Sequence, residues 1–191
     1  MLFPVVDTDF DVVLLDESGG AIGTAPKSTV HTTETPLHLG FSCYVLDGVG
    51  RVLITRRALS KRTWPGVWSN SFCGHPQPSE SVDDAVRRHA DHELGLRLVQ
   101  VEIALPTFRY RATDASGIVE NEICPVYTAL ACSRVEMNPD EVIEYAWVEP
   151  LDLGEAIRLT PSVFSPWMVW QARLMPLLGG APSANENRVD A

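Results

Sequence analysis

Residues 74–95 read GHPQPSESVDDAVRRHADHELG, and this stretch predicts one amphipathic helix with well-marked ends. Ser81, with Asp84 three residues later, suits a capping box at the start of the helix, and Gly95 suits the position just beyond its end. At about 100° per residue, one apolar stripe runs along the helix. The stripe consists of Val82, Ala85, Val86, Ala90 and Leu94. We therefore expect this face to pack against the core.

Two polar residues, His89 and Glu93, fall inside the apolar stripe. Burial of an unpaired carboxylate is costly in free energy. We therefore expect Glu93 to meet a cation, a metal ion or strong hydrogen-bond donors. The alternative is that the stripe opens to solvent at the end of the helix, where Glu93 pairs with an arginine.

Short strands are predicted on both sides of this helix. They fall at residues 12–15, 21–24, 39–46, 52–55, 119–130 and 142–148. The first four form two hairpins, and Ser165 with Pro166 opens a final helix that runs to Leu178. This pattern predicts an α/β or α+β fold, in which a mixed β-sheet is sandwiched between helices and the first hairpin is an N-terminal extension. Residues 1–178 are interpreted as a single domain, and residues 179–191, which are small and polar, as a disordered C-terminal tail.

The composition is that of an ordinary globular protein, with 45% hydrophobic and 21% charged residues among 191. No apolar run reaches the roughly 18 residues of a membrane helix, and the N-terminus lacks the features of a signal peptide, so we expect a cytoplasmic location without membrane contact. The net charge of −10 repels nucleic acid. A predicted long loop, residues 56–80, contains a basic cluster that suits a small anionic substrate. The cluster consists of Arg56, Arg57, Lys61 and Arg62.

Residues 118–124 read IVENEIC and place two carboxylates on one face of a predicted strand. Because side chains alternate along a strand, Glu120 and Glu122 share a face and lie about 7 Å apart. Like charges at this spacing repel each other unless a cation lies between them or one of them is protonated. If that face is open to water, the pair has no functional meaning.

Three histidines, His31, His38 and His75, add nitrogen ligands to these two carboxylates. The five residues together suit a divalent transition ion such as Mn²⁺, Fe²⁺ or Zn²⁺. Taken singly, each histidine is more often a packing or surface residue, so the fold must bring them together for a site to exist.

Four cysteines occur without a C-x-x-C pair, which indicates reduced thiols. Cys73 stands in the sequence Cys-Gly-His-Pro, in an exposed loop just ahead of the helix, where a thiol can become reactive. The alternative is that Cys73 is a small core residue, as lone thiols usually are.

The spacing of residues around the helix resembles the Nudix box. The pattern consists of Gly74, Glu80, Arg88, Glu93 and Gly95. It departs from the box of diphosphate hydrolases at His89 and His92, which replace glutamates that hold catalytic magnesium. This departure is typical of type I isopentenyl diphosphate isomerases, a branch of the Nudix superfamily. Four further stretches are similar to that branch, namely HTTETPLHLGFS, TRRALSKRTWPGVWSNSFCGHP, FRYRATDASGIVENEICPV and FSPWM.

The resemblance implies the Nudix fold and the interconversion of isopentenyl diphosphate and dimethylallyl diphosphate, a 1,3-allylic rearrangement in isoprenoid biosynthesis. It also implies one Mn²⁺ ion, or Zn²⁺ or Fe²⁺ in its place, with five protein ligands. These are His31, His38, His75, Glu120 and Glu122. Glu93 resembles the ligand of a second ion, Mg²⁺, that arrives with the diphosphate.

The same resemblance assigns the remaining site residues. Cys73 and Glu122 are similar to the catalytic pair, with Tyr110 supporting Glu122. Trp167 matches an indole beside the hydrocarbon, and packing in the core is its alternative role. The diphosphate-binding positions match Lys27, Arg57 and Lys61.

Two competing interpretations stay open at the level of sequence. A Nudix pyrophosphohydrolase of a nucleoside diphosphate derivative needs a metal-activated water and several glutamates in the box, and His89 and His92 count against it. A non-catalytic binding module would tolerate the loss of Cys73 or Glu122, yet both residues are present. The expected partner is a small-molecule diphosphate, with no nucleic acid and no obligatory protein partner.

Overall fold

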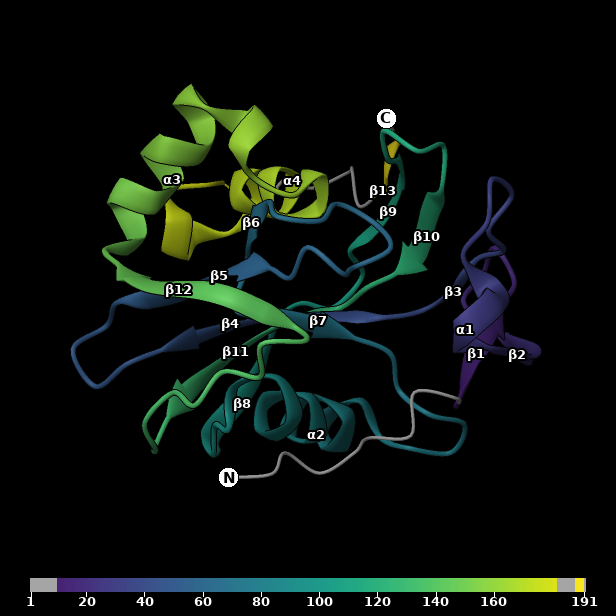
Figure 1. Cartoon of the computed structure of the whole chain (residues 1–191), viewed down its shortest axis with the longest axis horizontal. Helices are drawn as coiled ribbons and strands as arrows, with labels where there is room; N and C mark the ends of the chain where they lie inside the picture. The colour runs from purple at the N-terminus through teal and green to yellow at the C-terminus, as the bar shows by residue number, and fades with distance from the viewer. Residues whose placement is uncertain (1–9, 182–187, 191) are drawn as a thin grey trace.

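A computed structural model of the chain describes residues 10–181 and 188–190, and their strands form two mixed sheets (Figure 1). The large sheet has the order β12 (Val142–Val148), β5 (Val52–Arg57), β4 (Phe41–Leu46), β11 (Val126–Ala131) and β8 (Leu98–Leu105), with β6 (Trp68–Ser69) paired to β5 and β7 (Phe72–Gly74) paired to β4. The small sheet has the order β13 (Arg188–Asp190), β9 (Arg109–Thr113), β10 (Val119–Ile123), β3 (His38–Leu39), β1 (Asp11–Leu15) and β2 (Ala21–Pro26).

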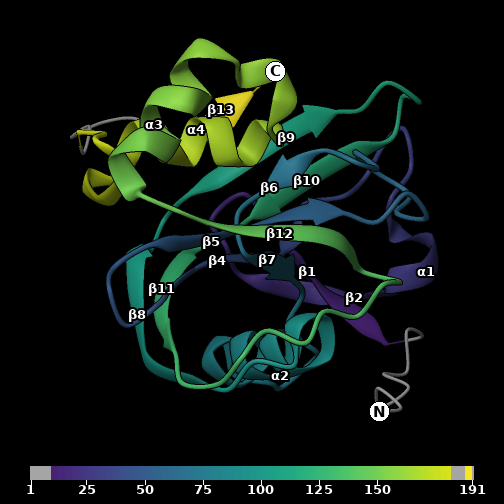
Figure 2. The same cartoon turned by 60° about the vertical axis from the view of Figure 1, so that its left-hand side comes forward.

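Helices cover both faces of the large sheet, as Figures 1 and 2 show. On one face lies α2 (Val82–Leu94), and on the other lie α3 (Pro150–Leu159) and α4 (Pro166–Leu174). The other helical segments of the described chain are short: α1 (Lys27–Val30), η1 (Pro161–Val163) and η2 (Pro176–Leu178). The predicted α+β sandwich is confirmed, although two mixed sheets replace the expected one. None of the described helices is both long and apolar enough to cross a membrane.

The predicted strand over residues 119–130 is wrong, because the segment forms two strands in different sheets. β10 ends at Ile123 and β11 begins at Val126, so Cys124 and Pro125 form the crossing between the small and the large sheet. Pro125 has no backbone N–H to continue the ladder, which explains the break. The two acidic residues of β10 are therefore held at the junction of the sheets.

The predicted final helix is also shorter than expected. α4 ends at Leu174, and a separate 3₁₀ turn follows from Pro176, because a proline ring disfavours a helical conformation in the residue before it. Sequence patterns missed α3, which begins with Pro150 in its first turn. The predicted disordered tail, residues 179–191, falls in large part outside the described residues and stays a prediction there.

The predicted ends and the apolar face of α2 are confirmed. Ser81 Oγ accepts a hydrogen bond from the backbone of Asp84 at 3.1 Å, and Gly95 adopts a left-handed φ of +58°. The buried apolar side chains of the helix pack against β4, β5, β8 and β11, and are Ala85, Val86, Ala90 and Leu94. A second core lies on the opposite face of the large sheet, where the sheet packs against α3, α4 and β9.

One carboxylate ties the loop before α2 to the helix. Glu80 accepts hydrogen bonds from Arg88 Nε at 2.8 Å, from Arg88 Nη2 at 2.7 Å and from the backbone of Gln77 at 2.8 Å. Arg88 Nη2 also donates to the carbonyl of His75 at 3.1 Å. Burial opposes the charge on Glu80, but these donors outweigh it and hold the pKa of the carboxyl below its ordinary value.

Glu80→Gln is expected to lower the free energy of unfolding at neutral pH by about 1 kcal/mol, because it removes a charge-assisted pair that solvent partly screens. The pKa of Glu80 is lower in the folded state than in the unfolded state. The contribution of Glu80 to stability is therefore fully present above its unfolded-state pKa and is lost as the pH falls through its folded-state pKa. Urea unfolding of both proteins at neutral pH, and at the lowest pH where both still fold, measures the effect. An equal difference at the two pH values would contradict the assignment.

Candidate active site

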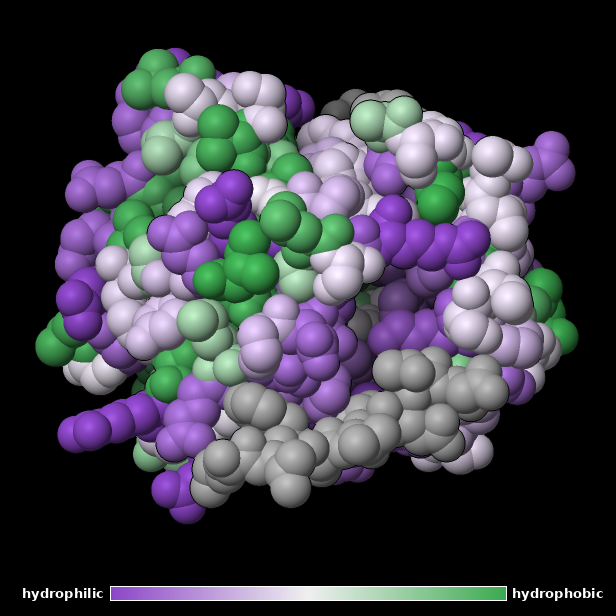
Figure 3. Space-filling view, viewed as in Figure 1, coloured by the Kyte–Doolittle hydropathy of each residue, from purple (hydrophilic) through white to green (hydrophobic). Residues whose placement is uncertain are grey.

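A cavity of about 490 Å³ opens where the two sheets meet, and α2 and α4 contribute to its wall. Figure 3 shows this hollow to the right of centre, edged by hydrophilic residues. The predicted site residues that line it are Lys27, His31, Arg57, Lys61, Cys73, His75, Glu93, Tyr110, Glu120, Glu122 and Trp167. The remaining predicted residue, His38, is fully buried and its ring lies 5.0 Å from that of His75.

Three imidazoles and one carboxylate converge in this cavity. The ligating atoms of His31, His38, His75 and Glu122 all lie within 4.8 Å of one another. His75 Nε2 lies 3.2 Å from His38 Nε2 and 3.0 Å from Glu122 Oε1. The register of the small sheet explains this arrangement, because β3 and β10 are parallel neighbours that place His38 beside Glu122.

The cluster fits one divalent ion. Ligands bound at about 2.1 Å to the same ion lie roughly 3 Å from their neighbours, which agrees with the 3.2 and 3.0 Å that separate His75 Nε2 from His38 and Glu122. His38 Nδ1 is hydrogen-bonded to the carbonyl of Pro36 at 2.9 Å, which directs Nε2 into the cluster. Burial lowers the pKa of His75 to about 4, so this ring is neutral at pH 7, as a ligand must be.

Glu120, the fifth predicted ligand, lies at the edge of the cluster. As strand alternation predicts, Glu120 and Glu122 point to the same side of β10, and both are buried rather than open to water. Glu120 Oε2 lies 3.0 Å from His31 Nε2, while its Oε1 accepts a hydrogen bond from Thr63 at 2.7 Å. Although close to Glu120, His31 Nε2 has no hydrogen bond of good geometry within the described chain, and a buried nitrogen of this kind suits a metal ligand.

Glu122 is ionised in this environment. Burial alone would raise the pKa of its carboxyl, but the contacts with the imidazoles of His38 and His75 outweigh burial and hold the pKa well below its ordinary value. Tyr110 lies opposite Glu122 in the pairing of β9 with β10. Burial raises the pKa of the Tyr110 phenol well above its ordinary value, so the phenol keeps its proton.

Cys73 lies in strand β7, so the predicted exposed loop just ahead of a helix is wrong. Pairing of β7 with β4 places Cys73 opposite Ser42, and α2 begins only at Val82. The sulfur lies 3.3 Å from Ser42 Oγ and 3.2 Å from Asn70 Oδ1. Burial raises the pKa of the thiol to about 12, with a smaller contribution from the charge of Glu122. The thiol is therefore neutral at pH 7.

The predicted basic cluster divides between the cavity and the outer surface. Arg57 lines the cavity and donates from Nη2 to the carbonyl of Thr63 at 2.9 Å, whereas Arg56 pairs with Glu144 outside it. Lys61 lines the cavity and forms an ion pair with Glu141. Burial lowers the pKa of Lys61 to about 8.

Lys27 enters the cavity from α1, at the end of the N-terminal hairpin. Its ammonium lies 4.8 Å from the centre of the Phe10 ring. Burial lowers its pKa, which the negative charge of Glu93 partly opposes. Lys27, Arg57 and Lys61 therefore reach one cavity from separate parts of the chain, as predicted for positions that bind one anion.

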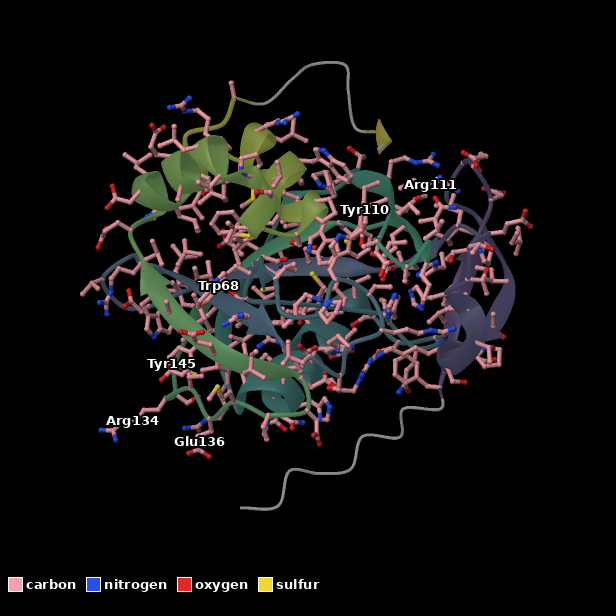
Figure 4. All side chains as sticks on the ribbon, turned by 45° about the horizontal axis from the view of Figure 1, so that its top comes forward. Trp68, Tyr110, Arg111, Arg134, Glu136 and Tyr145 are labelled. Carbon is pink, nitrogen blue, oxygen red and sulfur yellow. The ribbon has the colours of Figure 1, made fainter. Side chains whose placement is uncertain are left out.

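Aromatic rings form the apolar side of the cavity. Trp167 is only 3% exposed, so it packs in the core and lines the cavity at once. Its indole N–H donates to Asn70 Oδ1 at 3.0 Å, and the guanidinium of Arg57 lies 5.4 Å from the ring centre. Tyr110, labelled in Figure 4, lies beside α4 with its ring centre 5.8 Å from that of Trp167.

Glu93 is buried on α2 as the helix pattern predicted, but its partner is a histidine rather than an arginine. Glu93 Oε1 lies 2.9 Å from His89 Nδ1. Burial would raise the pKa of Glu93, and His89 and Lys61 outweigh burial and lower it. Among the described residues, the convergent ligand group is the histidine cluster with Glu122, and Glu93 lies outside that group.

Sequence reasoning missed several polar residues of the site. Ser42 and Asn70 contact the Cys73 sulfur, and Glu141 holds Lys61. Asn70 lies within the quoted stretch TRRALSKRTWPGVWSNSFCGHP, so its position carried a signal. Ser42 likewise ends the quoted stretch HTTETPLHLGFS, whereas Glu141 occurs in an ordinary loop context and only the tertiary structure brings it to the cavity.

Comparisons with known proteins show which proteins this chain resembles. Residues 36–170 match the model of the NUDIX domain. A protein of Agromyces mediolanus named isopentenyl-diphosphate Delta-isomerase is 64% identical over 173 residues, which cover 91% of this chain and 84% of that protein. A protein of the same name from Clavibacter sepedonicus is 58% identical over 180 residues, which cover 94% and 93%. The solved structure of DR0079 from Deinococcus radiodurans has a TM-score of 0.60 at 19% identity, covers 78% of this chain and 89% of that one, and so shows a likeness of fold alone.

Proposed function

The chain belongs to the NUDIX domain family and, within it, to the isopentenyl-diphosphate Delta-isomerases, and from this premise we propose how its cavity moves a double bond. The enzyme interconverts isopentenyl diphosphate and dimethylallyl diphosphate. The alternative of a pyrophosphohydrolase has no support from the named relatives. The observation that carries the proposed mechanism is that a neutral thiol and an ionised carboxylate, Cys73 and Glu122, line the same cavity.

The reaction requires one proton to be added at the terminal methylene and another to be removed from carbon two. Neither carbon is appreciably acidic or basic, and the transition state resembles a tertiary carbocation. Cys73 holds a proton on sulfur, and Glu122 has a free pair of electrons, so the pair contains both a donor and an acceptor. Tyr110, which pairs with Glu122 in the register of β9 and β10 and keeps its phenol proton, would pass a proton on that side of the site. One group adds a proton as the other removes one, so substrate and product have the same number of protons. Return of one proton between the two groups, by exchange with solvent or through Tyr110, would restore the enzyme for the next turnover.

Other residues would stabilise the carbocation-like transition state and exclude water from it. The indole of Trp167 can face the developing cation, an interaction of about 2 kcal/mol when it is dry. The hydrogen bond from the indole N–H of Trp167 to Asn70 Oδ1 keeps the ring at the cavity wall. Tyr110 and Trp167, both buried, form the apolar side of the cavity, and on that side they would keep water away from the cation.

The metal ions remain part of the proposal. A Mn²⁺ ion, or Zn²⁺ or Fe²⁺ in its place, would be held by the predicted set of His31, His38, His75, Glu120 and Glu122, and would supply positive charge beside the Glu122 carboxylate. Mg²⁺ at Glu93 would neutralise charge on the diphosphate. Lys27, Arg57 and Lys61 would bind the phosphate oxygens directly. A cytoplasmic location and the lack of nucleic-acid, membrane or obligatory protein partners stay predictions.

Solvent deuterium tests the proposed function. Isopentenyl diphosphate incubated with the enzyme in D₂O is expected to give dimethylallyl diphosphate that carries deuterium, because thiol, phenol and carboxyl protons exchange with solvent. Mass spectrometry of the product measures the incorporation, and a phosphate assay on the same sample serves as the control for hydrolysis. Release of phosphate without isomerisation would contradict the proposal.

A further inference from the structure

A chain of buried polar side chains ends on the sulfur of Cys73. Tyr44, Gln171 and Ser42 are each 0% exposed, in a core that is otherwise largely apolar. The Tyr44 hydroxyl bonds to Gln171 Oε1 at 2.9 Å, Gln171 Nε2 bonds to Ser42 Oγ at 2.9 Å, and Ser42 Oγ lies 3.3 Å from the Cys73 sulfur. Buried polar groups cost free energy unless they are paired, so a run of this kind calls for an explanation.

The direction of each hydrogen bond follows from the available protons. Gln171 Nε2 can only donate, so Ser42 Oγ accepts from it and must place its own proton elsewhere. Turning the Gln171 amide around would leave the Tyr44 hydroxyl proton without an acceptor among the contacts of the described residues. Ser42 has two sulfur neighbours, Cys73 at 3.3 Å and Cys124 at 3.4 Å.

Asn70 fixes the role of the Cys73 thiol as a donor. Its Nδ2 donates to the carbonyls of Cys43 at 3.0 Å and Phe72 at 2.7 Å, so its Oδ1 faces the Cys73 sulfur at 3.2 Å. Oδ1 can only accept, and therefore Cys73 donates its S–H to Asn70. Every proton then finds an acceptor if Ser42 donates to Cys73, the nearer of the two sulfurs, and Cys124 donates to Ser42 or to Glu122, which also contacts its thiol.

We propose that Ser42, held by Gln171, is a positioning residue that donates its hydroxyl proton to the Cys73 sulfur and so fixes the direction of the S–H bond. The S–H then points to the Asn70 oxygen that also accepts from the Trp167 indole at 3.0 Å. Asn70 Oδ1 thus fixes the position of the thiol proton relative to the Trp167 ring that is proposed to face the cation. The inference rests on the proposed role of Cys73 in proton transfer.

Two measurements on Ser42→Ala test this inference. The infrared S–H band of Cys73, isolated by subtracting the spectrum of a matching Cys73→Ala protein, is expected to shift when the Ser42 hydroxyl is removed. kcat is expected to fall roughly 10- to 100-fold, as it does when a reacting group is misplaced, with KM within about twofold because the diphosphate is bound elsewhere. Ser42→Thr, which keeps a hydroxyl, is expected to restore both the band and most of kcat.

Ser71→Ala is the matched control for loss of a buried hydroxyl. Ser71 is also 0% exposed, and its Oγ donates to the carbonyl of Leu53 and accepts from the backbone of Val45, each at 2.7 Å. An unshifted band, a kcat within twofold of the parent in Ser42→Ala, or an equal loss in Ser71→Ala would overturn the positioning role. Normal turnover in Cys73→Ala would instead refute the proposed proton-transfer role on which the inference rests, and the S–H band distinguishes the two failures because it requires no turnover.

Discussion

Cys73→Ala is expected to remove nearly all isomerase turnover. We expect kcat to fall by a factor of about 10² to 10⁴, which is the usual contribution of a positioned acid or base. In the proposed mechanism the neutral thiol carries a proton, and alanine offers no exchangeable proton in its place. Steady-state kinetics with isopentenyl diphosphate measure the loss. KM should change little, because the residues proposed to bind the diphosphate are untouched.

The stability of this variant should stay close to that of the parent protein. Cys73 is only partly buried, and its replacement deletes a single heavy atom, so the expected cost is about 1 kcal/mol. Cys132→Ala is the matched control, since Cys132 is exposed and does not line the cavity. Near-normal turnover in Cys73→Ala, or a comparable loss in Cys132→Ala, would rule out the proposed proton-transfer pair.

Removal of the divalent ion with a chelator is expected to abolish turnover and to lower Tm by roughly 10 °C. An ion present at a thousand times its Kd stabilises the folded state by about 4 kcal/mol, and each kcal/mol shifts Tm by about 2–4 °C in a chain of this size. Without the ion, the close approach of His38, His75 and Glu122 loses its main source of attraction. Metal analysis of the purified protein and differential scanning calorimetry measure the two effects.

Two variants make the metal prediction specific. His38→Ala removes a fully buried member of the cluster and should lower both metal content and Tm. Glu93 lies outside the convergent group. The Glu93→Gln protein should therefore retain the tightly bound ion, and only its dependence on added Mg²⁺ should weaken. Protein that is purified without any divalent ion, or a Tm that does not respond to the chelator, would be incompatible with this site.

Local sequence patterns were sufficient to predict the features that depend only on neighbouring residues, namely helix ends and the buried faces of helices and strands. The ends and buried face of α2 follow from Ser81, Gly95 and a helical period, and the shared face of Glu120 and Glu122 follows from strand alternation. Pro125 also carried a local signal, because a proline interrupts a ladder, but the continuous apolar pattern around it favoured one long strand.

The convergence of the site could not be derived from periodicity. His31 precedes β3, His75 follows β7 and Glu122 lies in β10, so their meeting depends on how two sheets pair and pack. The family resemblance, rather than any physical argument from the residues, supplied that grouping. The division of the basic cluster was within reach, because Arg56 and Arg57 are adjacent in β5 and adjacent strand residues point to opposite faces.

The parallel pairing of β3 with β10 also has a consequence for how the protein folds. It joins segments from distant parts of the chain, and each doubling of the closed loop adds about 0.6 kcal/mol of entropic cost. Contacts of this range form late, after local hairpins and helices. A chain that has formed only its local contacts has no complete set of ligands, so the ratio of bound ion to protein should report the fraction of molecules that have finished folding.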